Sequence, residues 1–299
     1  MKILVIFNPK SGPDTFNTNE FKDKVLSILK TGENENTEFV FIDITTDNID
    51  AEKIKHEAEE IKAIIISGGD GTISSFVNLV VENNIPLGII PNGTFNNFAS
   101  DNGIPENTEE ALKVIKNFNV KEIDIGTING DYFVNNSSIG LYTTSVKIRE
   151  KTQKEYRLNK LTAMSLALIR TFYLFPMIYV EVKTEGKVFK DKTPFVFIGN
   201  NKYHFNLLSL GMRESLVAGK IYVYHTKCKY RWCLIRIAVK ALFSFLHKEK
   251  DFISNSAEEI IIHSRKKKIT VAADGELYKM DTPLTYKITP KAVKLLAAK

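Results

Sequence analysis

Ser67-Gly68-Gly69-Asp70-Gly71-Thr72 is the stretch from which the rest of the fold can be worked out. It follows an apolar run at 63–66 that indicates a buried strand, and it precedes residues 73–81, where apolar side chains recur at helical spacing. Glycines let the backbone approach an anion closely, and the first amides of a helix point toward negative charge. The stretch therefore predicts a phosphate-binding turn, whereas a plain strand-to-helix turn would need only one glycine.

Asp70 is the unusual residue of this turn, because a bare carboxylate would repel phosphate. A cation between the two removes that conflict, and Mg²⁺ commonly bridges one or two carboxylates and substrate phosphates. We therefore expect Mg²⁺ beside Asp70.

The totals limit the class of protein. The 299 residues allow one large domain or two ordinary ones, and 43% hydrophobic residues are enough for a core. Because 41 basic residues stand against 35 acidic ones, the net charge of +6 does not require a nucleic-acid partner, and we expect none. The two cysteines, Cys228 and Cys233, predict reduced thiols in a cytoplasmic protein. We expect neither a signal peptide nor a transmembrane helix.

Strands and helices alternate through the first 120 residues. Apolar runs at 3–7, 39–45, 63–66 and 86–90 predict strands, and the segments 21–29, 50–62, 73–81 and 107–118 predict helices. This alternation is typical of an α/β domain with a parallel sheet. Polar turns at 8–12, 67–72 and 91–97 each follow a strand, so we expect them to meet at the carboxyl edge of that sheet, where ligands bind.

The pattern changes near residue 123. A hairpin is predicted over 123–135, helices over 142–153, 158–174 and 230–247, and strands over 178–185, 193–199, 220–226, 258–263, 269–273 and 284–289. We therefore predict an α/β domain over 1–123, an antiparallel β-sandwich over 124–289, and an active site in the crevice between them. Residues 290–299 are predicted to form a short tail helix.

Six short motifs, in this order and spacing, resemble the diacylglycerol kinase catalytic family, which includes bacterial lipid kinases and the sphingosine and ceramide kinases. They are Asn8-Pro9-Lys10-Ser11-Gly12, Gly68 to Thr72, Pro91-Asn92-Gly93-Thr94-Phe95-Asn96, Phe133 to Gly140, Ile198-Gly199-Asn200 and Asp274-Gly275-Glu276. The resemblance covers nearly the whole chain. It implies an α/β nucleotide domain like that of NAD kinases and a mainly antiparallel β-sandwich domain that carries the catalytic acids. It also implies a tail, residues 290–299, that packs back on the first domain.

The resemblance also implies roles for individual residues. ATP would be bound by Asn8, Pro9, Lys10, Ser11, Gly12, Thr45, Ser67, Gly68, Gly69, Asp70, Gly71, Thr72, Gly93, Thr94 and Asn96. Mg²⁺ would be held by Asp70, Asn97 and Glu276, and Asp274 would be the general base for a lipid hydroxyl, assisted by Glu276. Phosphoryl transfer needs this combination of charge neutralisation and one orienting carboxylate. A simple hairpin turn is the alternative for Asp274-Gly275, a common turn pair.

Three positions depart from the family pattern. Asn97 stands where many members have aspartate, which weakens metal binding, and Ser74-Ser75 replace a typical Asn-Glu pair. Ala218 stands where an aspartate of some relatives holds a structural metal, so we expect that metal to be absent. These changes leave open a non-catalytic protein that binds a nucleotide or lipid.

The sequence therefore predicts an ATP-dependent lipid kinase with a diacylglycerol-like substrate, and a kinase of a soluble hydroxyl compound such as NAD is a further alternative. Residues 161–175 and 230–247 combine aromatic and basic side chains, as membrane-surface helices do. Packing on the sandwich is the other interpretation of both. We expect peripheral contact with the inner membrane face through 230–247, and a homodimer remains open.

Overall fold

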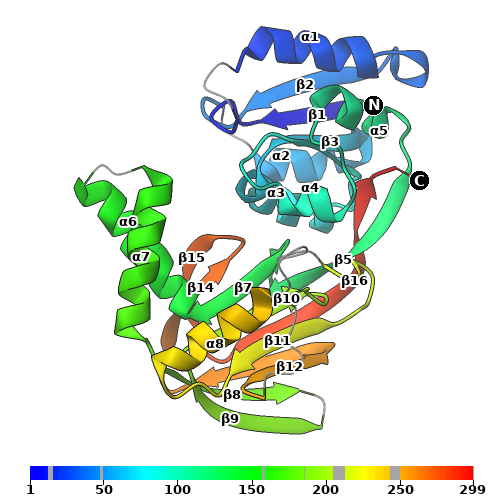
Figure 1. Ribbon diagram of the computed structural model, residues 1–299. Helices are drawn as coiled ribbons and strands as arrows, with labels where there is room; N and C mark the ends of the chain where they lie inside the picture. Colours follow the sequence, from blue (N-terminus) through cyan, green and yellow to red (C-terminus); the bar gives the residue numbers. More distant parts are fainter. Residues whose placement is uncertain are drawn as a thin grey trace. The chain divides into compact units, whose positions relative to one another are not determined.

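The computed structural model describes residues 1–12, 16–47, 50–156, 159–184, 186–204, 213–242 and 250–298. The chain folds into two compact units (Figure 1). The first comprises residues 1–125 together with 289–299, and the second comprises residues 126–288.

The first unit is an α/β domain. Its strands are β1 (Lys2–Phe7), β2 (Glu38–Asp43), β3 (Ile61–Gly68), β4 (Leu87–Pro91), the first part of β5 (Val120–Ile128) and the last part of β16 (Leu284–Leu296). Its helices are α1 (Thr18–Leu29), α2 (Ala51–His56), α3 (Asp70–Glu82), α4 (Asn97–Asp101) and α5 (Thr108–Lys116), with 3-10 turns η1 (Gly32–Asn34) and η2 (Ala58–Glu60). The strands pair in the order β2-β1-β3-β4, all parallel, which confirms the predicted sheet.

The core of this unit follows from the alternation of side chains along buried strands. Ile3, Val5 and Phe7 of β1 pack with Phe21 and Val25 of α1 on one face of the sheet. Figure 1 shows α1 on one side of these strands and α3 on the other. Both faces are therefore covered, which explains why the strands consist of continuous apolar runs.

The carboxyl-terminal segment is a strand, so the predicted helix over 290–299 is wrong. β16 continues to Leu296, and its Leu295 pairs in parallel with Leu87 of β4. Asp124, a buried carboxylate, accepts a hydrogen bond of 3.0 Å from the amide of Lys291, whose φ is +52°. A short apolar run can form either a helix or a strand, and here the open side of β4 decides the outcome.

The second unit is an antiparallel sandwich, as predicted. Its further strands are β6 (Asp131–Phe133), β7 (Asn136–Gly140), β8 (Ile178–Thr184), β9 (Lys187–Thr193), β10 (Phe195–Asn200), β11 (Ile221–Thr226), β12 (Phe252–Ala257), β13 (Glu259–Ser264), β14 (Lys268–Ala273) and β15 (Glu276–Asp281). One layer pairs β16-β13-β8-β9, and the other pairs β12-β11-β10-β7-β14-β15. Apolar side chains of both layers, among them Val182, Ile198 and Ile262, share one core.

Four strands of the sandwich were not anticipated, namely β7, β9, β12 and β15. They carry few continuous apolar residues, so pairing with a neighbour defines them more than periodicity does. The predicted tight turn at Asn129-Gly130 is present, with φ values of +51° and +101°.

In its described residues the second unit has three helices, α6 (Leu141–Tyr156), α7 (Lys160–Leu174) and α8 (Arg231–Leu242). Figure 1 shows α6 and α7 side by side. The predicted helix 230–247 is thus present to Leu242, and its residues 243–247 lie outside the described part of the chain.

The two cysteines are joined, so the prediction of two reduced thiols is wrong. A disulfide links Cys228 to Cys233, whose Cα atoms lie 5.6 Å apart, within the usual range for such a bond. Cys228 is buried with Ile237 in a small apolar cluster. Cys228 lies just after β11 and Cys233 lies in the first turn of α8, and the number of cysteines alone could not indicate that the two are bonded.

Candidate functional site

The glycine turn after β3 and the loop after β4 touch through their backbones. In the parallel register Gly68 lies opposite Pro91. The amide of Asn92 donates to the carbonyl of Gly68 at 3.1 Å, a usual length for such a bond. A Cβ atom added to Gly93 would lie 2.4 Å from the Cα of Gly69. Only glycine fits at this contact, which explains why each of the two loops has a glycine there.

The loop after β1 joins the same place. The amide of Asn8 donates to the carbonyl of Ser67 at 3.0 Å, and its side-chain Nδ2 lies 3.4 Å from Oγ1 of Thr72. Gly12 has φ +111°, and a Cβ atom there would lie 2.4 Å from Oδ1 of Asn92. The structure therefore brings the three predicted loops together at the carboxyl edge of the sheet.

The start of α3 faces this meeting point with its first amides. Gly69 is the N-cap residue, and within the described chain no side chain caps this 13-residue helix. The first amides of a helix lack partners within the helix and carry partial positive charge. A phosphate at this helix start would supply the missing acceptors.

Asp70 has a role that the sequence did not reveal. Its carboxylate accepts hydrogen bonds from the backbone amide of Asn97 at 3.0 Å, from Nδ2 of Asn97 at 3.2 Å, and from the amide of Phe98 at 2.9 Å. These are the first residues of α4. Asp70 therefore caps α4 and ties the glycine turn to the third loop, which is a second reason for an acid at this position.

Asn96 shapes the third loop from within. It is buried at φ +50°, its Oδ1 accepts from the amide of Gly93 at 2.8 Å, and its Nδ2 donates to the carbonyl of Gly93 at 3.0 Å. Thr94 and Phe95 between them are exposed at the loop tip. The sequence analysis did not assign a role to Phe95. An aromatic residue within a polar turn could have marked it as a candidate ligand contact.

Thr45 lies at the same edge of the sheet, just beyond β2. Its hydroxyl and amide both donate to Oδ1 of Asp43, at 2.7 and 2.8 Å. The amide of Ile44 donates to the carbonyl of Phe7 at 3.1 Å, which holds this turn beside the end of β1. The predicted nucleotide contact of Thr45 thus remains a prediction with a compatible location.

The residues predicted to hold Mg²⁺ were tested for their fit to a metal. In the described ranges, no three His, Cys, Asp or Glu side chains gather closely enough to hold a metal ion by themselves. Mg²⁺ usually takes one or two carboxylates plus phosphate oxygens and water, so Asp70 beside a bound phosphate would fit that pattern. Asn97 lies against Asp70, whereas Glu276 belongs to the second unit.

Asp274 and Gly275 form the two-residue turn between β14 and β15, with φ values of +49° and +92°. This is the hairpin turn that was the alternative interpretation. The carboxylate, however, is not a solvated turn side chain. It accepts from the amide of Val134 at 2.7 Å, from that of Asn135 at 2.7 Å and from that of Asn136 at 3.2 Å.

Glu276 is the first residue of β15 and is exposed. Two phenols that the sequence did not single out share its surroundings. Burial raises the pKa of Tyr278, and the carboxylates of Glu276 and Asp274 raise it further. Burial likewise raises the pKa of Tyr142, although Arg149 opposes this. Both phenols keep their protons at neutral pH and can donate hydrogen bonds beside the acidic pair.

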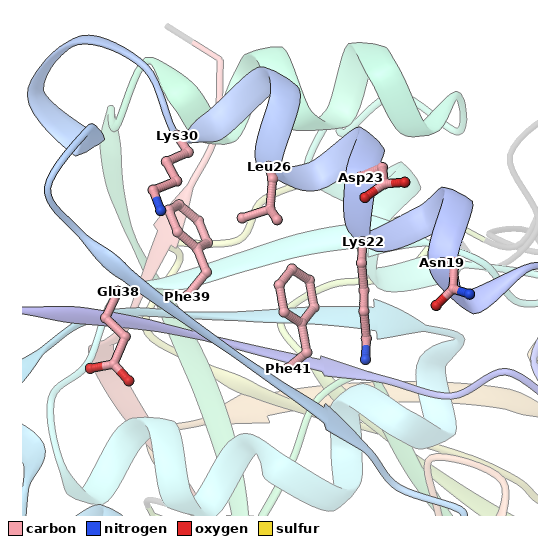
Figure 2. A pocket seen from close by; sticks show the side chains of 8 residues that line it. All are labelled: Asn19, Lys22, Asp23, Leu26, Lys30, Glu38, Phe39 and Phe41. Carbon is pink, nitrogen blue, oxygen red and sulfur yellow. The ribbon is translucent and has the colours of Figure 1, made fainter.

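A large hollow of the first unit, of about 680 Å³, lies elsewhere. Figure 2 shows it between α1 and the edge strand β2, with Lys22 and Lys30 beside the rings of Phe41 and Phe39. None of the residues predicted to bind the nucleotide lines it. The hollow therefore adds nothing to the glycine-loop site.

Residues 2–128 match the family model of the diacylglycerol kinase catalytic domain. Diacylglycerol kinases from the Newman and NCTC 8325 / PS 47 strains of Staphylococcus aureus are 30% identical to this chain over 200 residues. The alignment covers 65% of this chain and 61% of the length of those relatives.

Solved structures extend the likeness of the fold to the second unit. A crystal structure described as a diacylglycerol kinase from Bacillus anthracis str. Sterne is 22% identical, with a TM-score of 0.70. Another crystal structure from the same organism is 25% identical, with a TM-score of 0.75. Each comparison covers 99% of this chain and 97% of the other. The resemblance drawn from the motifs is thus confirmed, and over residues 2–128 this chain is similar to the diacylglycerol kinase catalytic domain.

Proposed function

We propose that this protein is an ATP-dependent lipid kinase that phosphorylates a hydroxyl group of a membrane lipid with a diacylglycerol-like structure. The observation that carries the proposal is the contact between Gly69 and Gly93, which joins two glycine loops beside the uncapped start of α3. Backbone amides arranged in this way suit phosphate groups. The matched family and the Staphylococcus aureus relatives support a kinase of this class.

In this proposal the first unit binds the phosphate donor. Residues 8–12, 67–72 and 93–96 would surround the phosphates of ATP, with Thr45 near the nucleoside. Mg²⁺ would neutralise phosphate charge beside Asp70, and Asn97 would keep its neighbouring position. An amide in place of a second carboxylate leaves less negative charge for the metal, so we expect weaker Mg²⁺ binding than two carboxylates would give.

The second unit would supply the acids. Asp274 would orient the lipid hydroxyl and accept its proton, and Glu276 would add negative charge nearby for the metal. Hydrogen bonds from three backbone amides hold the Asp274 carboxylate in one orientation, which suits a group that must meet a hydroxyl at a fixed angle. The crevice predicted between the domains remains a prediction.

One observation favours a second candidate, a non-catalytic protein that binds a nucleotide or lipid. The carboxylates of both Asp70 and Asp274 are engaged by backbone amides, so structural roles alone would account for the two acids. A soluble-alcohol kinase of the NAD-kinase type remains the third candidate.

An assay with labelled ATP over a panel of lipids and soluble alcohols, NAD included, separates the three candidates. We expect label in a diacylglycerol-like lipid only. The variant Asp274→Asn should lose this turnover and still bind ATP, because the loops lie in the other unit. Label in NAD would favour the third candidate. Binding of ATP without any transfer would favour the second.

We also propose a membrane contact, through α8 together with α7. Large apolar side chains are exposed on α7 (Leu166, Leu168, Ile169, Tyr173 and Leu174) and on or beside α8 (Tyr230, Trp232, Ile235 and Val239). The rings of Phe172 and Trp232 lie 6.3 Å apart and join the two sets. The sequences of α7 and α8 contain basic residues and no acidic ones, which suits an anionic lipid surface.

Among the described residues, no helix is long and apolar enough to cross a membrane. The proposed contact is therefore peripheral, and we place it at the inner membrane face, where ATP is present. Flotation with phosphatidylglycerol vesicles tests it. Trp232→Ser combined with Tyr173→Ser should reduce binding, whereas Val188→Ser, an exposed apolar site on β9, should not. Equal binding of the wild type and both variants would end the membrane proposal.

Sedimentation would show whether the protein is a homodimer.

A further inference from the structure

The segment from Val134 to Asn136 follows β6 and includes the first residue of β7, and it is bound on both of its edges. Its three amides donate to the carboxylate of Asp274, as described above. The carbonyl of Asn136 accepts from the amide of Asp274 at 2.9 Å, and the carbonyl of Asn135 accepts from the amide of Asn200 at 3.3 Å. The carbonyls of Val134 and Asn135 also accept from side chains. This short stretch of backbone therefore links the predicted catalytic acid to a second group of side chains.

Three side chains donate to the carbonyls of this segment. Nη1 of Arg213 lies 3.1 Å from the carbonyl oxygen of Val134, and Nδ2 of Asn200 lies 3.2 Å from it. The hydroxyl of Tyr203 donates to the carbonyl of Asn135 at 2.7 Å.

The donors and the carboxylate share peptide groups. The carbonyl of Val134 and the amide of Asn135 belong to one peptide bond, so Arg213 donates at one end while Asp274 accepts at the other. The next peptide is held in the same way between Tyr203 and Asp274. Hydrogen bonds in such chains polarise and strengthen one another.

The positions of the donors are firmly set. Asn200 and Tyr203 are buried, and Arg213 is 9% exposed. The amide of Tyr203 donates to the hydroxyl of Tyr224 at 3.0 Å, and its ring meets Phe197 edge-on at 5.2 Å. A buried guanidinium is costly unless it forms hydrogen bonds. That of Arg213 donates to the carbonyl of Val134 in this segment.

We propose that Arg213 and Tyr203 are positioning residues for the kinase reaction, which hold peptides 134–136 so that their amides fix the carboxylate of Asp274. The inference rests on the proposed role of Asp274. Losing a donor lets the peptides rotate, and the carboxylate then loses its orientation toward the lipid hydroxyl. The effect falls on turnover, because neither residue belongs to the glycine loops that bind the donor nucleotide.

Tyr203→Phe is the first variant, since it removes one hydroxyl and keeps the ring. We expect kcat to fall about fivefold, the equivalent of one net hydrogen bond of about 1 kcal/mol, with KM for ATP and lipid unchanged. Tyr286→Phe is the matched control. It removes another buried hydroxyl of the same sandwich, bonded to Ser137 at 3.0 Å, and should lower stability while kcat stays at the wild-type value.

Arg213→Lys and Arg213→Met form a second pair. Lysine can still donate to the carbonyl of Val134 and methionine cannot, so Arg213→Lys should keep more of kcat than Arg213→Met. Thermal unfolding identifies the temperature at which every variant is folded for the kinetic assay. Equal kcat losses for the two substitutions would count against a positioning role for Arg213.

A double-mutant cycle with Asp274→Asn is decisive. If Tyr203 acts through Asp274, then Tyr203→Phe lowers kcat in the wild type and has no further effect in Asp274→Asn. Wild-type kcat in Asp274→Asn would refute the proposed role of Asp274. Where Asp274→Asn does lower kcat, the positioning role alone would be refuted if Tyr203→Phe had no effect in the wild type, or if it lowered kcat by the same factor in Asp274→Asn as in the wild type.

Amide exchange gives a readout that needs no turnover. In Tyr203→Phe the amides of Asn135 and Asn136 should exchange faster with solvent, while those of β10 and β11 keep their protection. Unchanged exchange at both amides would overturn the inference, whether or not the protein proves to be a kinase.

Discussion

The contact between Gly69 and Gly93 gives the sharpest prediction for the phosphate site. In the variant Gly93→Ala the new Cβ atom would lie 2.4 Å from the Cα of Gly69. Non-bonded carbon atoms approach one another to about 3.5–4.0 Å, so the two loops must separate by roughly 1 Å or more. The closest contacts are with the backbone of Gly69, which cannot turn away as a side chain could, and Oδ1 of Asn96 would lie 2.8 Å from the same Cβ atom.

The separation should affect catalysis more than folding. Overpacking of this kind costs about 1–3 kcal/mol in the free energy of unfolding. A misplacement of about 1 Å in a binding site can lower the rate about 100-fold, so we expect kcat/KM for ATP to fall by roughly that factor. The assay is transfer of labelled phosphate to a diacylglycerol-containing vesicle, with direct ATP binding measured alongside.

Gly88→Ala is the control for a general loss of stability. Gly88 lies within β4, and a Cβ atom there would lie 3.2 Å from side-chain atoms of Ile115 and Ile65, which can give way. We expect a lower melting temperature from this variant and an unchanged kcat/KM. If Gly93→Ala keeps kcat/KM within about twofold of the wild type, the loops do not need their contact and the phosphate site has been misplaced.

Three further predictions concern stability. Asp70→Ala should lower the free energy of unfolding by about 1 kcal/mol, because α4 loses its cap, and should abolish ATP turnover; urea unfolding and the kinase assay measure the two, and unchanged stability would contradict the capping role. Burial lowers the pKa of His225, although Asp191 opposes this, so the folded state keeps the imidazole neutral while the unfolded chain takes up a proton below about pH 6.5. Stability should therefore fall between pH 7 and pH 5 in the wild type and fall less in His225→Gln, as urea unfolding at the two pH values would show. Reduction of the disulfide between Cys228 and Cys233 should cost about 2 kcal/mol, as expected for a short closed loop, and a double Cys→Ser variant should show no response to reductant in thermal unfolding.

The parallel sheet and the convergence of the loops could be predicted because both follow from local patterns. Each loop comes directly after an apolar run, and parallel strands place their carboxyl ends at one edge. The position of each glycine in the chain is then enough to place it at that edge of the sheet. Gly69 and Gly93 meet as expected through their backbones, and Gly12 lies against the side chain of Asn92 from the third loop.

The tail could not be predicted in the same way. Val293, Leu295 and Leu296 are buried, and their spacing is compatible with a helix or a strand. The choice depends on β4, about 200 residues earlier in the chain, whose edge offers hydrogen bonds to β16. Long-range pairing of this kind leaves little trace in a single sequence.

The partners of the two acids could not be predicted either. They are backbone amides, which every residue except proline supplies, so no residue type marks them in the sequence. Asp70 and Asp274 each bind amides of a segment distant in sequence, 97–98 in one case and 134–136 in the other. The sequence could identify the acids as unusual and could not identify what holds them.

The way in which Asp274 is held also changes how its substitution should be interpreted. A carboxylate offers about four acceptor sites, and at least three of those on Asp274 receive backbone amides. In Asp274→Asn one oxygen becomes an NH₂ group that faces N–H donors, so the segment from Val134 to Asn136 must move as well. Loss of turnover in that variant therefore combines a missing negative charge with a displaced backbone. Tyr203→Phe disturbs the backbone and leaves the charge, and the comparison of the two variants separates orientation from basicity in the action of Asp274.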